Sequence, residues 1–368
     1  MSLLDWFQSR WKNAAVHTTY EFLDASRVDG RTMSSAPIRS GEHYFRISLA
    51  EMFLKNDREW FTAYSPAVYS VVKLRFGDKE ESLSHVAGPS GLKDLKATSM
   101  NKGVMINYPL MPLVPFNGGD IELESGLVAL PGSNDVKRFL KVLTDFSKTL
   151  AVPQLSLALS FAQPLVDGIT ELVGSDETKL VLRLHDSFTQ GGTIRAGYLA
   201  LINAATGTLD KNEMWVKGDR LHYGATKDSA LPLEGYDYVL LRLDSVDERD
   251  DYSSLSSIDG PYQSAITALN ESVVEPDPQK QKDKLTEAER LLGAAKVAVF
   301  KSKELTFKTG RRQVIQALQK GFDEAKALLA GGAAEQAISR TLAEAMTGAM
   351  SAEEALLAGE VSVADLGG

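Results

Sequence analysis

The sequence predicts an α+β protein in which two β-sandwich-like units are bridged by a helical hairpin and followed by an all-helical C-terminal tail. Three observations predict this class. First, segments in which apolar and polar residues alternate, as in strands, recur in the same order in two parts of the chain. Second, a charge-free stretch with a polar stripe at helical spacing lies between these two parts. Third, Ala-rich segments with apolar residues at helical spacing follow them. The recurring order indicates a tandem duplication, with two unrelated β units as the alternative.

The expected domain boundaries follow these changes of pattern. The linker Glu275-Pro276-Asp277-Pro278 has the composition of a stiff polar spacer and marks the last boundary. The expected parts are an N-terminal helical docking segment at 1–34, a first β-rich unit at 35–132, a helical hairpin at 133–174, a second β-rich unit ending in a helix at 175–275, and an Ala-rich helical tail at 276–368.

Each β-rich unit opens with a strand of period two. In the first unit, Phe45, Ile47 and Leu49 alternate with their neighbours as a half-buried strand requires, and residues 179–188 repeat the pattern. Both units continue through a second run, a Pro-Leu turn and a third run, and both close with an amphipathic helix. The expected strands are 43–53, 67–76 and 121–130 in the first unit and 179–188, 194–202 and 238–246 in the second.

Between the two β-rich units, residues 149–166 carry no charge over eighteen positions, a length at which a membrane span becomes a candidate. Ser156, Ser160 and Gln163 form a polar stripe at helical spacing, however, and this indicates an amphipathic helix. We therefore expect an antiparallel helical pair over 135–148 and 154–173. A membrane-inserting segment and a partner-binding helix are the alternatives.

The tail repeats helical stripes of Leu, Ile and Ala that are separated by glycines. Helices rich in Ala bury a modest area each, which favours docking on the body or on another chain over independent folding. The segment Met1 to Tyr20, with Trp6, Phe7 and Trp11, is expected to be a further docking helix.

Composition indicates an ordinary globular protein, because 43% of the 368 residues are hydrophobic and 24% are charged. The absence of cysteine excludes disulfides and thiolate chemistry and fits a reducing compartment. The first residues lack the pattern of a secretory signal, so we expect a cytoplasmic protein. A net charge of −9 makes nucleic-acid binding unlikely except through a local patch.

Motifs for catalysis and for cofactors are missing from the sequence. No Gly-Lys dipeptide occurs, which excludes a Walker A loop, and neither a Gly-x-Gly-x-x-Gly nor a Gly-x-Ser-x-Gly pattern is present. His185 and Asp186 are adjacent, but neighbouring side chains of a strand point to opposite faces, so the carboxylate does not orient the imidazole. We therefore expect no catalytic and no cofactor-binding residues.

A group of carboxylates lies where strands of the second β-rich unit end. Carboxylates from two loops at one end of a sandwich supply the oxygen ligands that calcium prefers, with a solvated acidic loop as the alternative. The arrangement resembles a C2-type lipid-binding domain, and the resemblance implies calcium-dependent contact with lipid. The candidate ligands are Asp186, Asp244, Asp247, Asp250 and Asp251.

Charge changes sign abruptly between the second β-rich unit and the tail. Ten acidic residues between Asp237 and Asp277 precede eleven basic residues between Lys280 and Lys320, so the tail is expected to pair with an acidic surface of its neighbour or of another protein. Nucleic acid and anionic lipid are the other ligands that suit such a region. The candidate partner-binding residues are Lys296, Lys301, Lys303, Lys308, Arg311 and Arg312.

These observations predict a non-enzymatic protein-interaction module that acts as an adaptor, scaffold or regulated effector. A membrane-active or lipid-binding protein, using the acidic loops with calcium or the apolar residues 149–173, is the first alternative. A hydrolase of unfamiliar architecture is the second.

Overall fold

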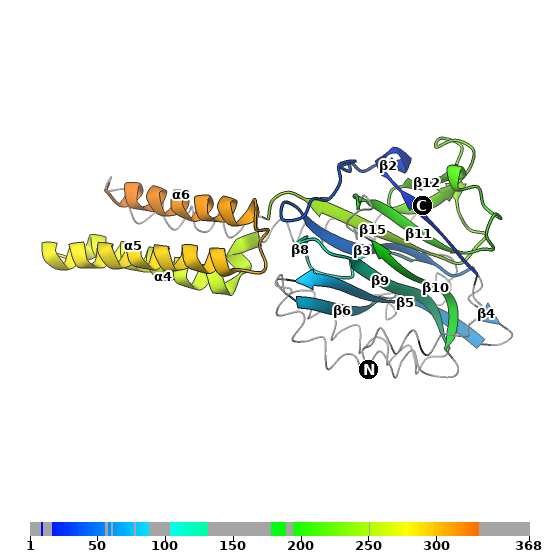
Figure 1. Ribbon diagram of the computed structural model, residues 1–368, viewed down its shortest axis with the longest axis horizontal. Coiled ribbons are helices and arrows are strands. Elements are labelled where there is room, and N and C mark those ends of the chain that lie inside the picture. Colours follow the sequence, from blue (N-terminus) through cyan, green and yellow to red (C-terminus); the bar gives the residue numbers. More distant parts are fainter. Residues whose placement is uncertain are drawn as a thin grey trace, which may run out of the picture. The chain divides into compact units, whose positions relative to one another are not determined.

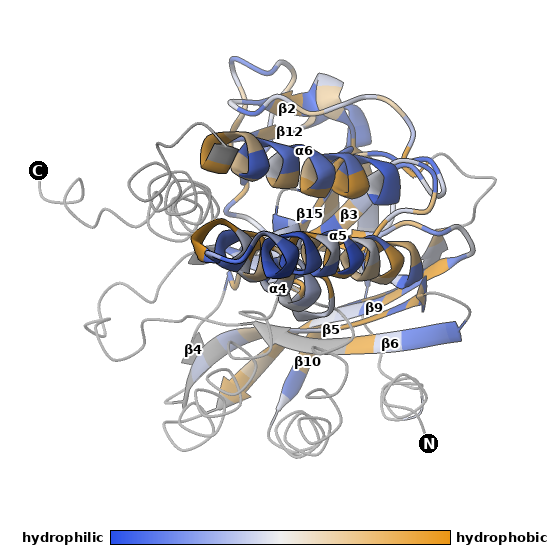
Figure 2. Ribbon diagram, turned by 90° about the vertical axis from the view of Figure 1, so that its left-hand side faces the viewer, coloured by the Kyte–Doolittle hydropathy of each residue, from blue (hydrophilic) through white to orange (hydrophobic). Residues whose placement is uncertain are grey.

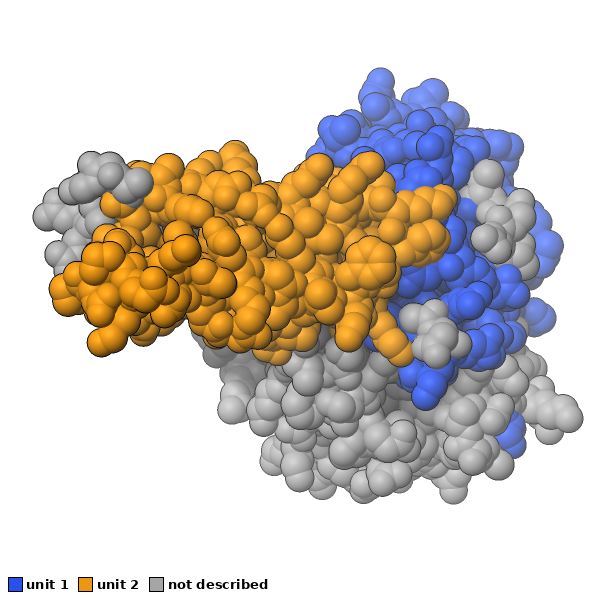
Figure 3. All heavy atoms as spheres, turned by 60° about the vertical axis from the view of Figure 1, so that its left-hand side comes forward, with its two compact units in different colours: residues 1–247 blue, residues 248–368 orange. Residues whose placement is uncertain are grey.

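Among the described residues the strands precede the long helices, which confirms the predicted α+β class. In the computed structural model, the chain divides into two units, Met1–Asp247 and Glu248–Gly368, which we call the β unit and the helical unit (Figure 3). The structure describes residue 9 and residues 17–55, 58–59, 62–76, 79–87, 104–131, 178–188, 194–249 and 251–330. The predicted hairpin at 133–174 and the tail beyond residue 330 lie outside the described residues.

Three sheets make up the described part of the β unit (Figure 1). Sheet I is formed, in spatial order, by β1 (Thr18–Leu23), β11 (Gly197–Asn203), β15 (Tyr238–Val246), β3 (Tyr44–Phe53) and β7 (Val104–Pro109), with β8 (Val114–Pro115) also on β3. Sheet II is formed by β10 (Lys179–Phe188), β9 (Ile121–Pro131), β5 (Thr62–Phe76) and β4 (Arg58–Glu59), with β6 (Lys79–Ala87) on β5. Sheet III is formed by β14 (Leu231–Pro232), β13 (Arg220–Tyr223), β12 (Met214–Lys217) and β2 (Val28–Asp29).

The strands of the two predicted β-rich units are interleaved in sheets I and II. Antiparallel pairing joins β15 to β3 and β10 to β9 along most of their lengths. In sheet I, the order β11-β15-β3 places the second and third strands of the second predicted unit beside the first strand of the first unit. In sheet II, the order β5-β9-β10 places the second and third strands of the first unit beside the first strand of the second unit. This corrects the expectation of two separate β units. The third strand of each predicted unit would have an open edge by itself, and here that edge is paired with the first strand of the other unit.

Sheet I is the middle layer (Figure 1). Apolar side chains cover both of its faces. One buried cluster joins it to sheet II, and a second joins its other face to sheet III. The first cluster includes Leu49, Leu199 and Leu241 of sheet I with Val72, Leu127 and Leu182 of sheet II. The second includes Ala50, Tyr198 and Leu240 of sheet I with Met214, Val216 and Leu221 of sheet III. The first strand, expected to be half-buried, is consequently buried on both faces.

The helical unit contains α4 (Ser256–Val274), α5 (Pro278–Lys301) and α6 (Gly310–Ala330). Asp277 caps α5 by accepting a hydrogen bond from the Gln279 N–H at 2.8 Å, and Pro278 occupies the first helical turn, where its missing N–H costs nothing. The predicted linker is thus the turn between α4 and α5. The division between the two units comes earlier, at Asp247, so α4 belongs to the helical unit.

Packing of the three helices uses small and apolar side chains, and their remaining faces are polar (Figure 2). Ala288, Leu292, Ala295 and Val299 are the buried residues of α5. None of the helices in the described part of the chain is both long and apolar enough to cross a membrane.

At the N-terminal side, the expected docking helix does not extend to Tyr20. Residues 18–23 form strand β1, which pairs with β11, and a 3-10 turn at Ala25–Arg27 leads into β2. Thr19, Glu21 and Leu23 alternate with Thr18, Tyr20 and Phe22, the period of a strand. The earlier part of the predicted segment, apart from residue 9, lies outside the described residues.

Candidate functional site

The predicted basic residues gather around the turn between α5 and α6. We call this region the basic–aromatic surface, defined as Lys296, Phe300, Lys301, Lys303, Phe307, Lys308, Arg311 and Arg312. Phe300 is 67% exposed and Phe307 is 50% exposed, although large apolar side chains are usually buried. The side chains of Arg311 and Lys308 lie over the rings of Phe300 and Phe307, at 5.8 and 6.0 Å from the ring centroids.

Hydrogen bonds beneath this surface hold the turn in place. Ser302 ends α5 with its N–H bonded to the Val299 carbonyl, and the Thr306 hydroxyl accepts the N–H of Gly310, the first residue of α6, at 2.7 Å. Arg311 donates to the Ser302 carbonyl at 2.9 Å. A surface held in this way loses little conformational entropy when it binds.

Arg249 supports the same turn from inside the helical unit. Its guanidinium is fully buried and donates to the Glu304 carbonyl at 3.3 Å and to the Asp251 carboxylate at 3.0 Å. Leu305 and Thr306 are buried on this inner side. The turn between α5 and α6 is therefore part of the packed unit, with the aromatic rings on its outer side.

Neutral atoms accept hydrogen bonds from two of the cations. Lys296 donates to the side-chain oxygen of Gln319 across the α5–α6 interface, and Arg311 donates to a backbone carbonyl. These contacts orient the cations without cancelling their charge. Elsewhere in the unit, cations are neutralised in pairs: Lys284 with Glu275 at 3.4 Å and Lys326 with Glu289 at 3.0 Å.

The predicted calcium ligands are distributed over both units. Asp244 pairs with Arg242 at 3.0 Å, and Asp247 pairs with His43 at 3.2 Å. Asp186 accepts the N–H of Ser187 at 2.8 Å, and Asp251 is bound by Arg249 in the helical unit. Asp250 lies outside the described residues. Within the described ranges no group of three or more His, Asp or Glu side chains gathers as a metal site would, and calcium binding remains a prediction.

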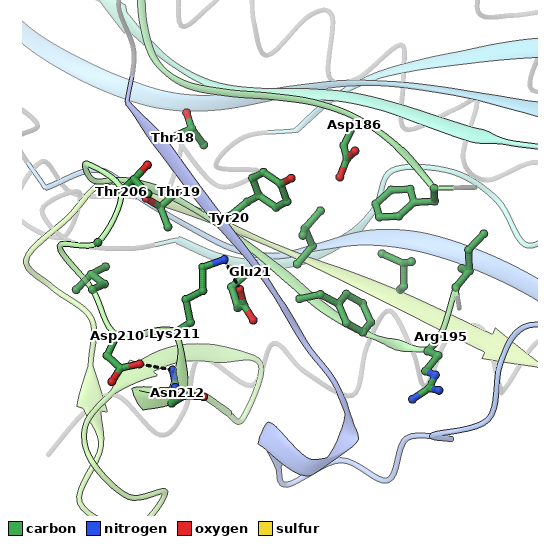
Figure 4. A pocket seen from close by; sticks show the side chains of 17 residues that line it. Thr18, Thr19, Tyr20, Glu21, Asp186, Arg195, Thr206, Asp210, Lys211 and Asn212 are labelled. Atoms are coloured by element: carbon green, nitrogen blue, oxygen red, sulfur yellow. Dashed lines mark hydrogen bonds and ion pairs between the residues drawn. The ribbon is translucent and has the colours of Figure 1, made fainter. Parts of the chain in front are cut away.

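A groove of about 860 Å³ lies in the β unit beside the edge strand β1 (Figure 4). It is lined by the consecutive residues Thr18–Phe22, by Asp186 and Phe188 at the end of β10, and by the segment 206–212. Glu21 and Lys211 form an ion pair at 2.9 Å on one wall, and this hydrogen-bonded pair raises the pKa of Lys211. The sequence carried no motif for this groove.

Three buried ionic clusters in the described part of the β unit, built on Asp219, Glu124 and Glu51, were not predicted from the sequence. Asp219 is bound by Arg242 and Arg31, each at 3.3 Å, and by the hydroxyl of Tyr198. Asp219 follows Gly218 in the turn between β12 and β13. Both residues have a positive φ, which is 54° for Gly218 and 61° for Asp219. A Gly-Asp pair between two short apolar runs is a hairpin signal that would have located this turn.

The second cluster is built on Glu124, whose side chain is fully buried. It accepts two hydrogen bonds from Arg183, at 2.6 and 3.0 Å, and one from the Tyr69 hydroxyl at 3.2 Å. His185 lies with its Nδ1 at 3.4 Å from Glu124, so its carboxylate neighbour is Glu124 and not the adjacent Asp186. Burial, together with the nearby charge of Glu124, raises the pKa of Tyr69 well above its usual value. The cluster ties three strands of sheet II together.

No known protein family, curated protein or solved structure matches this chain.

Proposed function

We propose that the protein is a non-catalytic interaction module, an adaptor, scaffold or regulated effector, whose helical unit binds an acidic partner protein through the basic–aromatic surface. The observation that carries this proposal is the exposure of Phe300 and Phe307, 67% and 50%, each beside a cation on a hydrogen-bonded turn. Exposed aromatic rings next to arginine are typical of residues that dominate binding energy at interfaces.

Both components of the surface contribute to such binding. Burying a phenylalanine side chain completely stabilises a complex by roughly 1.5–3 kcal/mol, and Phe300 and Phe307 still have 67% and 50% of their area exposed. The surrounding cations accelerate encounter with an acidic surface and select against basic partners. An acidic protein that presents an apolar patch therefore matches both features.

A protein partner is favoured over an anionic membrane or a nucleic acid. The whole chain carries a net charge of −9, which repels polyanions that approach within the roughly 8 Å over which charges act at physiological ionic strength. The attractive region is limited to one turn and the helix ends beside it. A folded acidic protein of matching shape can contact that region alone, whereas a membrane or a duplex presents a wide anionic surface.

The interaction is tested by affinity capture with the full chain as bait. The double substitution Phe300→Ser and Phe307→Ser should remove the specific partner, and Lys308→Glu with Arg311→Glu should do the same. The matched control is Val274→Ser at the end of α4, because Val274 is 79% exposed and lies outside the basic–aromatic surface. A partner set that survives both double substitutions would contradict the proposal.

Liposome flotation separates the lipid-binding alternative from the proposed function. Vesicles with anionic headgroups, with and without calcium, should leave the protein unbound. Capture in either condition would favour the membrane-active function, and a dependence on calcium would favour the carboxylates Asp186, Asp244 and Asp247 as ligands.

Two further features are proposed for the same protein. The mirrored orders β11-β15-β3 and β5-β9-β10 support a tandem duplication of sandwich-like units in which the two copies exchanged their first strands. The lack of cysteine in the sequence supports a function in the cytoplasm.

A further inference from the structure

Strand β1 lies at one edge of sheet I, and its pairing determines which backbone groups face outward. In the neighbouring strand, Asn203 donates its N–H to Asp237 on the β15 side. Because N–H directions alternate along a strand, the residues of β11 that point toward β1 are Tyr198, Ala200 and Ile202. Their partners in β1 are Leu23, Glu21 and Thr19.

The alternate residues of β1 therefore direct their N–H and C=O groups away from sheet I. These residues are Thr18, Tyr20 and Phe22. Among the described strands, none pairs with this outer edge. An edge of this kind is a template for a further strand.

The groove surrounds this free edge from both faces of β1 (Figure 4). Tyr20 and Phe22 share a face with their partners Leu201 and Leu199, which belong to the core between sheets I and II. Thr19 and Glu21 belong to the opposite face, where Lys211 pairs with Glu21. The groove thus has one apolar wall and one polar wall, with the backbone edge of β1 between them.

Strand β10 forms the far side of the groove, and two of its N–H groups are already bonded to side chains. The Arg183 N–H donates to the Thr18 hydroxyl at 3.1 Å, and the Ser187 N–H donates to the Asp186 side chain at 2.8 Å. The first contact brings β1 and β10 together at one end of the groove.

We propose that the groove binds an extended peptide segment of a partner protein, which adds to β1 as an antiparallel strand. Backbone groups of Tyr20 and Phe22 would pair with the peptide, as in other cases of strand addition. In an antiparallel hydrogen-bonded pair, opposite residues share a face, so the peptide residues bonded to β1 lie on the apolar wall. The site therefore selects a segment in which apolar and polar residues alternate.

An unsatisfied donor in the groove supports a peptide as its occupant. The Nε of Arg195 is buried and has no hydrogen-bond acceptor among the described residues, and Arg195 lines the groove. Buried donors are almost always satisfied in folded proteins, and a peptide carbonyl supplies the acceptor. This site is separate from the basic–aromatic surface, and its occupation does not depend on the proposed function of the helical unit.

The test uses the full chain and a capped probe peptide of three valine–threonine repeats flanked by lysines. Binding is measured by calorimetry for the probe, for a version methylated on the valine nitrogens and for a version methylated on the threonine nitrogens. The probe should bind, methylation of valine should weaken binding at least about tenfold, and methylation of threonine should leave it unchanged. Failure of the probe to bind, or equal binding of all three peptides, would overturn the proposal.

Variants at Tyr20 provide a second test. Tyr20→Pro removes the side chain together with an outward N–H, a change that an edge strand tolerates. Tyr20→Ala removes the side chain but keeps the N–H, so Tyr20→Pro should bind the probe at least about tenfold more weakly than Tyr20→Ala. In hydrogen exchange of the wild type, the probe should protect the amides of Tyr20 and Phe22, while those of Thr19 and Glu21 are protected without it. Unchanged exchange at Tyr20 and Phe22 with the probe bound would also overturn the proposal.

Discussion

The β unit and the helices of the helical unit are held together by different kinds of contact. Glu51 and Glu124 are fully buried in the β unit, and each is matched by an arginine and a tyrosine hydroxyl. The helices pack through residues such as Ala288 and Ala295 and keep their ion pairs at the surface. The strands of the β unit thus pack around buried charges, whereas the helices pack through small and apolar side chains and the buried Arg249 of the helical unit lies before α4.

The difference follows from the number of layers in each unit. Sheet I is covered on both faces, so polar side chains on its strands have no route to water and need partners inside. Glu51 binds Arg220, the Leu221 N–H and the Tyr238 hydroxyl, and so connects sheet I to sheet III. An exposed helix face needs no such partners, because its polar side chains reach solvent. Sensitivity to mutation should therefore differ between the units.

The largest expected effect is the loss of a buried cation. Arg242→Met leaves the carboxylates of Asp219 and Asp244 without their shared partner, which should destabilise the β unit by about 3–5 kcal/mol. Unfolding of each unit is followed separately by hydrogen-exchange mass spectrometry in urea. The control is Arg290→Met, which breaks the exposed pair with Glu287 and should leave stability unchanged within error. Equal effects of the two substitutions would remove the contrast between the units.

A smaller effect is expected from overpacking the helices. Ala295 is fully buried on α5, and Ala295→Leu should destabilise the helical unit by about 1–3 kcal/mol, because the neighbouring helices must move apart. The β unit should be unaffected by the same measurement. Ala294→Leu, at the exposed neighbouring position, is the matched control and should be close to neutral. A neutral Ala295→Leu would show that the helices do not pack closely.

The smallest expected effect is a loss of stability of the β unit at alkaline pH, which can be compared with the helical unit. Burial, with the charge of Glu51, raises the pKa of Tyr238, and burial raises the pKa of Tyr108 to about 12. The pKa of these tyrosines is higher in the folded protein than in the unfolded chain, where it is about 10. The stabilisation is therefore complete below about pH 10 and is lost as the pH rises through the pKa of the folded state. We expect the stability of the β unit to fall progressively above about pH 10.

Spectrophotometric titration measures the ionisation of the tyrosines that accompanies this loss of stability. Tyr238→Phe should reduce the loss of stability at high pH, even though it removes a hydrogen bond to Glu51 and lowers stability at neutral pH. Tyr262→Phe is the corresponding change in the helical unit, where burial raises the pKa of Tyr262 to about 12. If Tyr238 ionised freely near pH 10 in the folded protein, the buried arrangement with Glu51 would be wrong.

Local patterns in the sequence were sufficient to locate single elements. The strands at 179–188 and 238–246 have the predicted bounds, because alternation and a run of β-branched and Leu residues are local properties. The cations from Lys296 to Arg312 gather because one short turn joins the helices that carry them. The hairpin closed by Gly218 and Asp219 was missed, although its turn residues carry a signal.

Relations between distant segments were not predictable from these patterns. The pairing of β3 with β15 and of β10 with β9 depends on strand edges far apart in the sequence, and so does the meeting of Glu124 with His185. Strand geometry correctly indicated that Asp186 does not orient His185, but it gave no sign of Glu124, which lies opposite His185 on β9. The groove beside β1 was missed for the same reason, because its walls come from several segments that are far apart in the sequence.

The most direct test of the central claim is site-specific photocrosslinking in cells. A photoreactive phenylalanine analogue replaces Phe300 or Phe307 in the full chain, and, as controls, Val274 and Ala294 at other exposed positions of the helical unit. The account predicts one discrete protein adduct from positions 300 and 307, none from the control positions, and loss of the adduct when Lys308 and Arg311 are changed to Glu. Absence of an adduct at 300 and 307, or equal adducts at all four positions, would contradict it.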